Sequence, residues 1–436
     1  MSWEVTLLLL FGGLVLLMFL GMPVAFSFMT VNLVTTYLLF GRYGINQLVL
    51  NMYDSIKSFV LVPIPMFILM GELLFRSGLV NRGLNALSQW LGRLPGRLSV
   101  LALMGGTVFA AASGSSLANT AMLSSSLLRD MLQRRYSKLM SAGPILAAGS
   151  LAMIIPPSSM AVILGAIGNI SIGKLLIAGI VPGILMALVS IGYIIIRCWL
   201  DPSLAPAYEV ELAPFRRRIY MLARDILPIG FLVFLVIGLL FLGVATPSES
   251  AALGAVGGFL LALLNGRLTA SVLRESLLAT VRVTGMILLI MAGAAAYGYL
   301  LASTGATRAM IEAVLSLKLP PLAVIAAMQL AVLLLGGPLD QISILMVTMP
   351  IFMPIVNALG FDPVWFGILM LINLDLANLT PPLGLTLYVV KAAAPEDFTM
   401  EEVTRSAVPF IILDIAVMAL LMAFPGLVTW LPNRAR

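Results

Sequence analysis

Two proline pairs, each inside a long apolar stretch, constrain this chain more than any other feature. Pro156-Pro157 interrupts the segment 146–165, and Pro381-Pro382 interrupts the segment 369–390. Because proline has no N–H and clashes with the preceding helical turn, each helix must break there. In a bilayer, broken backbone is tolerated only inside protein or beside a polar cavity. Two broken helices at matching places in two halves therefore indicate the binding site of a transporter.

The composition places these stretches in a membrane. Hydrophobic residues make up 61% of the chain, charged residues make up 10%, and the mean hydropathy is +1.09, outside the range of soluble proteins. Apolar stretches of about 20 residues, the length that spans a bilayer, recur along the sequence. The net charge of +6 therefore indicates unequal loops and no nucleic-acid partner. No Lys or Arg precedes Arg42, so we expect a retained first helix instead of a signal peptide.

The residues that are missing exclude several kinds of chemistry. The chain has no histidine and one cysteine, Cys198. Histidine-ligated metals, Ser-His triads, cysteine clusters and an intrachain disulfide are therefore excluded. The sequence also has no Walker A, HExxH or Gly-x-Ser-x-Gly motif. We expect a protein that is not an enzyme and that holds no cofactor.

The apolar pattern predicts an all-α polytopic membrane protein with two re-entrant helical hairpins. The segments 98–128 and 322–356 carry small or turn-forming residues in the middle, at 113–116 and at 336–340. A helix that turns back at such a cluster forms a re-entrant hairpin instead of a span. The expected spans, hairpins and broken helices are 3–20, 23–40, 59–76, 98–128, 141–168, 175–197, 226–243, 250–265, 284–304, 322–356, 364–392 and 407–430.

Four further stretches predict helices that lie along the membrane interface. In one of them, apolar residues recur on one helical face from Val80 to Leu94, opposite Arg82 and Arg93. The stretches are either ordinary interfacial loops or arms that brace one domain while another moves. They are 44–57, 80–97, 267–283 and 306–318.

The two halves of the chain repeat one pattern in opposite orientations. A shift of 225 residues carries Pro156-Pro157 onto Pro381-Pro382 and Ser115 onto Asp340. Because the first half is expected to cross the membrane an odd number of times, the second half starts from the opposite side. With the N-terminus outside, most of the 25 basic residues fall inside, as the positive-inside rule requires. The sequence predicts an inverted-topology repeat with both termini periplasmic and a polar loop at 197–225 between the halves.

The hairpin tips and the helix breaks together predict two related sodium sites. Helix ends leave carbonyl oxygens without intrahelical donors, and these oxygens lie at the negative end of the helix dipole. Hard cations such as sodium bind in such all-oxygen surroundings. The first site is predicted from Ser113, Gly114, Ser115, Ser116, Ala152, Ile155 and Ser158. The second site is predicted from Gly336, Gly337, Asp340, Ala377, Thr380 and Leu383.

The half-helices that start after the proline pairs predict the substrate region. Their positive N-termini point at the same place as the tips and suit a carboxylate. The alternative is that the serines and glycines are packing residues, which membrane interfaces favour. Asp340 and Asp375 lie within apolar segments, where acids are functional candidates, although Asp375 could be a hydrogen-bonded structural acid. The predicted substrate region is Ser115, Asn119, Pro156, Pro157, Ser158, Pro381, Pro382 and Gly384.

At these residues the chain resembles the large membrane subunit of tripartite ATP-independent periplasmic (TRAP) transporters, of the C4-dicarboxylate and sialic-acid type. The motifs that carry the resemblance run in order through nearly the whole chain. They are PIPMFILMGELLFRSG (63–78), ASGSSLANTA (112–121), IIPPSSMAVILGAIGNISIGKLLIAGIVPG (154–183), GVATPSESAA (243–252), LGGPLDQISILMVTMPIFMPI (335–355) and LTPPLGLTLYVV (379–390).

The resemblance implies an elevator-type transporter, with a static scaffold and a mobile transport domain, in the bacterial inner membrane. It implies sodium-driven uptake of an organic acid that a periplasmic binding protein delivers, with a separate four-helix membrane subunit. On this basis we expect scaffold and arm helices in 1–97 and 226–321 and transport elements in 98–168 and 322–392. The segment 169–225 would be a helix and the loop between the repeats, and 393–436 the C-terminal helix.

Two other functions remain open at this stage. A single-component sodium–carboxylate symporter of similar inverted-repeat design would need no binding protein. An ion channel is disfavoured, because the sequence shows no ring-forming filter motif and paired broken helices suit alternating access.

Overall fold

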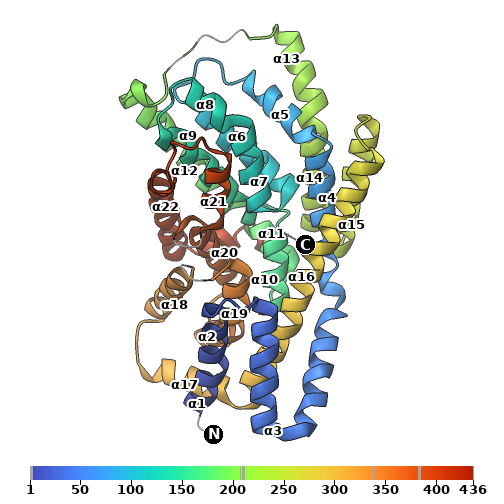
Figure 1. Cartoon of the computed structure of the whole chain (residues 1–436), viewed down its shortest axis with the longest axis vertical. Coiled ribbons are helices and arrows are strands. Elements are labelled where there is room, and N and C mark those ends of the chain that lie inside the picture. Colours follow the sequence, from blue (N-terminus) through green and yellow to red (C-terminus); the bar gives the residue numbers. More distant parts are fainter. Residues whose placement is uncertain (1–2, 207, 209–211, 337–338, 382–383, 436) are drawn as a thin grey trace.

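The structure is a computed structural model that describes residues 3–206, 208, 212–336, 339–381 and 384–435 (Figure 1). All regular elements in these ranges are helical, which confirms the all-α prediction. Three predicted site residues, Gly337, Pro382 and Leu383, lie outside the described residues, and so does the side chain of Ser113.

The first half of the chain, up to the loop between the repeats, contains twelve α-helices within the described ranges. They are α1 (Trp3–Leu7), α2 (Gly13–Phe19), α3 (Val24–Ile56), α4 (Pro63–Arg76), α5 (Leu79–Ser88), α6 (Arg97–Ser113), α7 (Ser116–Leu123), α8 (Arg129–Gln133), α9 (Lys138–Ser150), α10 (Ser159–Gly168), α11 (Ile172–Ala178) and α12 (Ile180–Leu200). Leu8–Gly12 and Ser124–Leu128 are π-helical turns, and Phe59–Leu61, Leu151–Met153 and Pro202–Leu204 are 3-10 turns.

The second half repeats this order. Its helices are α13 (Phe215–Met221), α14 (Leu227–Phe241), α15 (Pro247–Leu264), α16 (Ala270–Ser303), α17 (Ala306–Ser316), α18 (Pro321–Leu335), α19 (Gln341–Ala358), α20 (Pro363–Leu379), α21 (Leu385–Ala393), α22 (Met400–Ala423) and α23 (Gly426–Thr429). A π-helical turn, Leu222–Ile226, joins α13 to α14, and a 3-10 turn, Pro432–Arg434, follows α23.

Eight helical segments among the described residues are long and apolar enough to cross a bilayer. Because so many membrane-length helices occur in one chain, the fold is that of a multi-pass membrane protein. The segments are Val24–Ile56, Phe59–Arg76, Ile172–Leu200, Phe215–Phe241, Pro247–Leu264, Ala270–Ser303, Gln341–Ala358 and Met400–Ala423.

Both hairpins and both helix breaks occur where the sequence predicts them. The chain turns between α6 and α7 at Gly114, whose φ of +58° favours glycine. The ends of this hairpin meet, because the Leu98 N–H donates to the Tyr136 hydroxyl at 3.4 Å. The second hairpin turns between α18 and α19, which contact each other. Helix α9 ends before Pro156-Pro157 and α20 ends before Pro381, as the missing proline N–H requires.

The halves pack as an inverted repeat. Under the shift between the halves, α15 corresponds to the start of α3, and the end of α16 corresponds to α4. The structure pairs these helices reciprocally, since α3 packs on α16 and α4 packs on α15. The first hairpin enters from the end of the molecule where α5 and α13 lie, and the second enters from the opposite end, near α17 (Figure 1).

The two repeats also exchange partners at their centre. Helix α10, which follows the first break, packs on α19 of the second hairpin. Helix α21, which follows the second break, packs on α7 of the first hairpin. The two tips are therefore brought to one place by contacts between residues more than 150 positions apart in the sequence.

Several predicted boundaries were wrong. The stretch 267–283 is not a separate interfacial helix, because α16 runs unbroken from Ala270 to Ser303. Its corresponding arm in the first half does separate from its span, at a kink where Gly41 has a φ of +62°. Helix α5 ends at Ser88, so the stretch 80–97 is helical only in its first part. The loop between the repeats is shorter than 197–225, because α12 extends to Leu200 and α13 begins at Phe215.

Candidate functional site

One cavity of about 310 Å³ collects both hairpin tips and the starts of both half-helices. The first tip contributes Ser115 and Ser116, and Ser159 begins the half-helix α10. The second tip contributes Asp340, and Leu385 begins the half-helix α21. Helices α4 and α16 form the facing wall. The volume lies in the range of small-molecule sites.

At the first tip, hydroxyl groups and helix N-termini meet. The Ser115 hydroxyl caps α7 by accepting the Ala118 N–H at 3.4 Å. The Ser159 hydroxyl donates to the Gly114 carbonyl at 2.9 Å, which fastens the tip to the first break. The Ser116 hydroxyl is 6% exposed and has no hydrogen-bond partner among the described residues. Because α7 and α10 both begin here, their free N–H groups favour a negatively charged ligand.

The second tip has the same backbone plan with an acidic side chain. Asp340 caps α19 by accepting the Ile342 N–H at 3.1 Å and the Ser343 N–H at 3.4 Å. The Ser343 hydroxyl also donates to this carboxylate. Gly336 lies against the second break, since a Cβ there would come within 2.5 Å of the Ala377 Cβ. Only glycine permits this approach of the tip to α20.

A second, smaller cavity of about 30 Å³ lies between this tip and the second break. Gly336, Asp340 and Ala377 line it, together with Leu339, Gln341, Asn378 and Leu385. A space of about 10–15 Å³ on this measure holds one water, so the cavity has room for a single dehydrated cation. Three of the six residues predicted for the second sodium site therefore surround one ion-sized space beside a carboxylate.

The structure separates the other predicted residues from this space. Thr380 donates its hydroxyl to the Leu376 carbonyl at 2.7 Å within its own helix. Ser158 caps α10 and donates to the Met153 carbonyl at 2.6 Å, fully buried. Ala152 and Ile155 are also buried, on the connection through the first break. Sodium binding at either place stays a prediction.

Asn119, predicted in the substrate region, holds helices together. Its amide group donates to the Gly106 carbonyl at 3.1 Å and to the Ala148 carbonyl at 2.8 Å. It is 1% exposed and does not line the large cavity. The prediction that it contacts substrate gains no support from this geometry, because its side chain joins α6, α7 and α9.

The sequence interpretation missed several residues of the cavity. Ser159 and Gln341 are next to predicted residues and were overlooked, although both follow an N-cap. Glu72 also lines the cavity and pairs with Arg76 at 2.7 Å. Its i, i+4 spacing to Arg76 had suggested only an ion pair. The apolar wall from α16 has no sequence signal, because its side chains resemble those of any lipid-facing helix.

Solved structures with the same architecture define the class of protein. The YdaH transporter of Alcanivorax borkumensis superposes with a TM-score of 0.68, covering 95% of this chain and 98% of that one, at 14% sequence identity. At this identity the likeness concerns the fold alone. The chain therefore has the fold of a polytopic α-helical membrane transporter.

Sequence comparisons identify the family. The family model "Tripartite ATP-independent periplasmic transporter, DctM component" matches residues 11–427. The chain is 30% identical over 427 residues to the sialic acid TRAP transporter large permease protein SiaM of Vibrio cholerae serotype O1, covering 97% of both. It is also 30% identical over 402 residues to the C4-dicarboxylate TRAP transporter large permease protein DctM of Pseudomonas aeruginosa, covering 91% of this chain and 92% of that one. This chain belongs to the DctM family of large TRAP transporter permeases, which confirms the resemblance.

Proposed function

We propose that this chain is the membrane subunit that carries an organic acid inward, driven by a sodium gradient. The observation that carries the proposal is the cavity shared by both hairpin tips and both half-helix starts. Paired broken helices that meet at one central site are the arrangement expected of alternating-access transporters. The relatives in Vibrio cholerae and Pseudomonas aeruginosa are named for sialic acid and for C4-dicarboxylates, so a carboxylate is the group to be recognised.

The charges of the cavity divide the work between the two tips. The substrate carboxylate would bind at the first tip, where Ser116 and the N-termini of α7 and α10 offer donors. A sodium ion would bind at the second tip, where Asp340 supplies the only formal negative charge of either tip. Another sodium ion would bind between the first tip and the first break. Ion and substrate of opposite charge would then stabilise each other across the cavity.

The proposed movement is an elevator motion. The hairpins and broken helices, 98–168 and 322–392, would travel together as the transport domain. The helices of 1–97 and 226–321 would stay in place as the scaffold. The wall that α4 and α16 present to the cavity is mainly apolar, which allows the two parts to slide without breaking strong polar contacts. The four amphipathic stretches of the scaffold would brace it.

The proposed assembly is tripartite, in the bacterial inner membrane with both termini on the periplasmic side. A periplasmic binding protein would deliver the substrate, and a separate four-helix membrane subunit would widen the scaffold. Exposed aromatic side chains on α3, including Tyr37, Tyr43 and Tyr53, provide an apolar flank for that subunit.

Reconstitution tests this proposal. Liposomes with this chain and its small subunit should take up substrate only when the loaded binding protein is outside and sodium is directed inward. The matched control reverses the sodium gradient at the same binding-protein concentration. Uptake of free substrate by this chain alone would replace the tripartite proposal by a single-component symporter. Uptake that is unaffected by sodium would remove the coupling ion from the mechanism.

A further inference from the structure

Apart from the tips, the walls of the large cavity are apolar. Phe75 of α4 and Met286 of α16 are 38% and 50% exposed and line the cavity from the scaffold side. Ile287, next to Met286, also lines it but is nearly buried. Met160 and Ile163 of α10 line the opposite side. Large apolar side chains that stay open to a binding cavity are there to contact an apolar ligand surface.

The charged residues among the described lining residues are both acidic. They are Glu72 and Asp340. Arg76, the nearest base to Glu72, lies between two carboxylates, with Glu72 at 2.7 Å and Glu275 at 2.7 Å. Its guanidinium is therefore engaged by two partners and does not line the cavity. A sodium ion at the second tip would neutralise Asp340 but would not provide a partner for another anion.

We propose that the substrate of this site is a monocarboxylate with an apolar body. The inference rests on the proposed function, because it assigns the carboxylate to the first tip and asks what the remaining space accepts. A second carboxylate would face Phe75, Met286 and Ile287, or the acidic groups of Glu72 and Asp340. Burying a charge without a partner is strongly unfavourable. Phe75, Met286 and Ile287 are therefore the residues that exclude a dicarboxylate.

The volume limits the size of the body. At about 30 Å³ for each water-sized group, a cavity of about 310 Å³ accepts a ligand of roughly ten non-hydrogen atoms. A six-carbon acid fits within this limit. A polyhydroxylated acid of the same size would leave its hydroxyl groups against the apolar wall without partners.

Hexanoate and adipate form a matched pair of probes, because they differ only in the group at the far end of a six-carbon chain. Their apparent Kd is measured from thermal unfolding of the purified full-length chain in nanodiscs, in sodium and in potassium buffer. Hexanoate should bind at least about tenfold more tightly than adipate in sodium, since a site rejects a group that it cannot pair. 1-Hexanol, which lacks the carboxylate, controls for partition into the lipid and should not shift the unfolding midpoint.

A charge placed in the wall should reverse the preference. Met286→Lys puts an ammonium group opposite the first tip and should raise the affinity for adipate about tenfold. Met310→Lys on α17 makes the same chemical change away from the cavity and should leave both affinities unchanged. This gain of binding does not depend on a variant that merely fails to fold.

The outcomes separate the two levels of the argument. If wild-type chain binds adipate as tightly as hexanoate in sodium, the monocarboxylate inference is overturned and the proposed function stands. If neither acid binds in a sodium-dependent manner, the proposed function is overturned and the inference falls with it. If Met286→Lys and Met310→Lys change adipate affinity equally, the apolar wall is not the selective element.

Discussion

The two hairpin tips share a backbone plan and differ in charge. Each tip begins a helix with a side-chain cap, from Ser115 on α7 and from Asp340 on α19. Each also lies against the helix break of its own repeat, through Gly114 at the first tip and Gly336 at the second. The first tip carries neutral hydroxyl groups, whereas the second carries a carboxylate. Repetition thus fixes where the chain turns, and single substitutions decide what each turn binds.

The difference gives the site a direction. A substrate anion is attracted to the helix N-termini of the first tip and repelled by Asp340 at the second. A cation has the opposite preference. Two identical tips would offer no such orientation, so the asymmetry is what converts a symmetric fold into a site for two unlike ligands.

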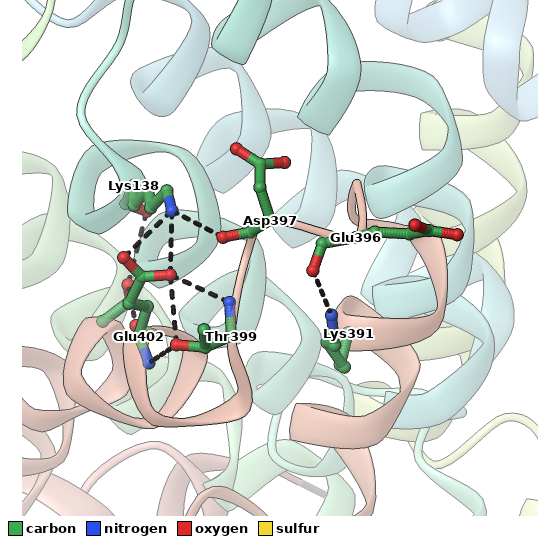
Figure 2. A network of polar contacts seen from close by, with 7 residues as sticks. Lys138, Lys391, Glu396, Asp397, Thr399 and Glu402 are labelled. Carbon is green, nitrogen blue, oxygen red and sulfur yellow. Dashed lines mark hydrogen bonds and ion pairs between the residues drawn. The ribbon is translucent and has the colours of Figure 1, made fainter.

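The outer ends of the repeats differ in the same way (Figure 2). At the start of α9, the Lys138 ammonium donates to both carboxylate oxygens of Glu402 on α22, at 2.9 and 2.8 Å. It also donates to the Asp397 carbonyl at 2.9 Å. The corresponding start of α20 is capped by Asp362 alone, which accepts the Val364 N–H at 2.7 Å. One repeat is therefore joined to its neighbour by an ion pair, and the other is closed by a local cap.

The largest expected effect concerns the opposite orientation of the hairpins. Gln133 and Asn357, at the bases of the first and second hairpins, are both exposed. Cysteines at these positions, in a Cys198→Ser background, should react with a membrane-impermeant maleimide from opposite sides of the membrane. The background substitution leaves no other thiol in the chain. Reaction of both positions from a common side would show that the repeats are not inverted.

The next effect concerns the charges of the tips. Asp340→Ser keeps a side chain that can cap α19 but removes the carboxylate, so half-maximal uptake should need at least about tenfold more sodium, as for a lost charged ligand. Ser115→Ala removes a neutral oxygen and should raise the sodium requirement by about threefold to tenfold. Sodium titration of uptake in liposomes measures both. Equal shifts in the two variants would contradict the asymmetry, and no shift in either would remove both sodium sites.

The smallest effects concern the outer ends. Asp362→Ala should lower the apparent free energy of unfolding by about 1 kcal/mol, the usual contribution of an N-cap. A double-mutant cycle of Lys138→Ala and Glu402→Ala should give a coupling energy of about 0.5 kcal/mol, because the pair is partly exposed to solvent. Thermal unfolding in detergent measures each change. A coupling energy larger than the Asp362 effect would mean that the ion pair, and not the cap, is the stronger fastening.

The sequence by itself determined where the helices break and turn. Proline without an N–H ends α9 and α20 wherever they pack, and the small residues at 113–116 and 336–340 allow tight turns between apolar helices. These are local covalent and steric constraints, so they could be identified from neighbouring residues. The repeat followed from them, because the same constraints recur 225 positions apart. The family motifs also lie mostly at these places.

Only the tertiary structure decided which of these residues meet. Ser116 and Asp340 line one cavity because α10 packs on α19 and α21 packs on α7, and no local pattern encodes contacts between the halves. The same holds for the continuity of α16, whose first turns could equally have formed a separate interfacial helix like the one after Gly41. The apolar wall of Phe75 and Met286 was hidden for a physical reason. A side chain that faces a ligand and one that faces lipid satisfy the same hydrophobic requirement, and only packing distinguishes them.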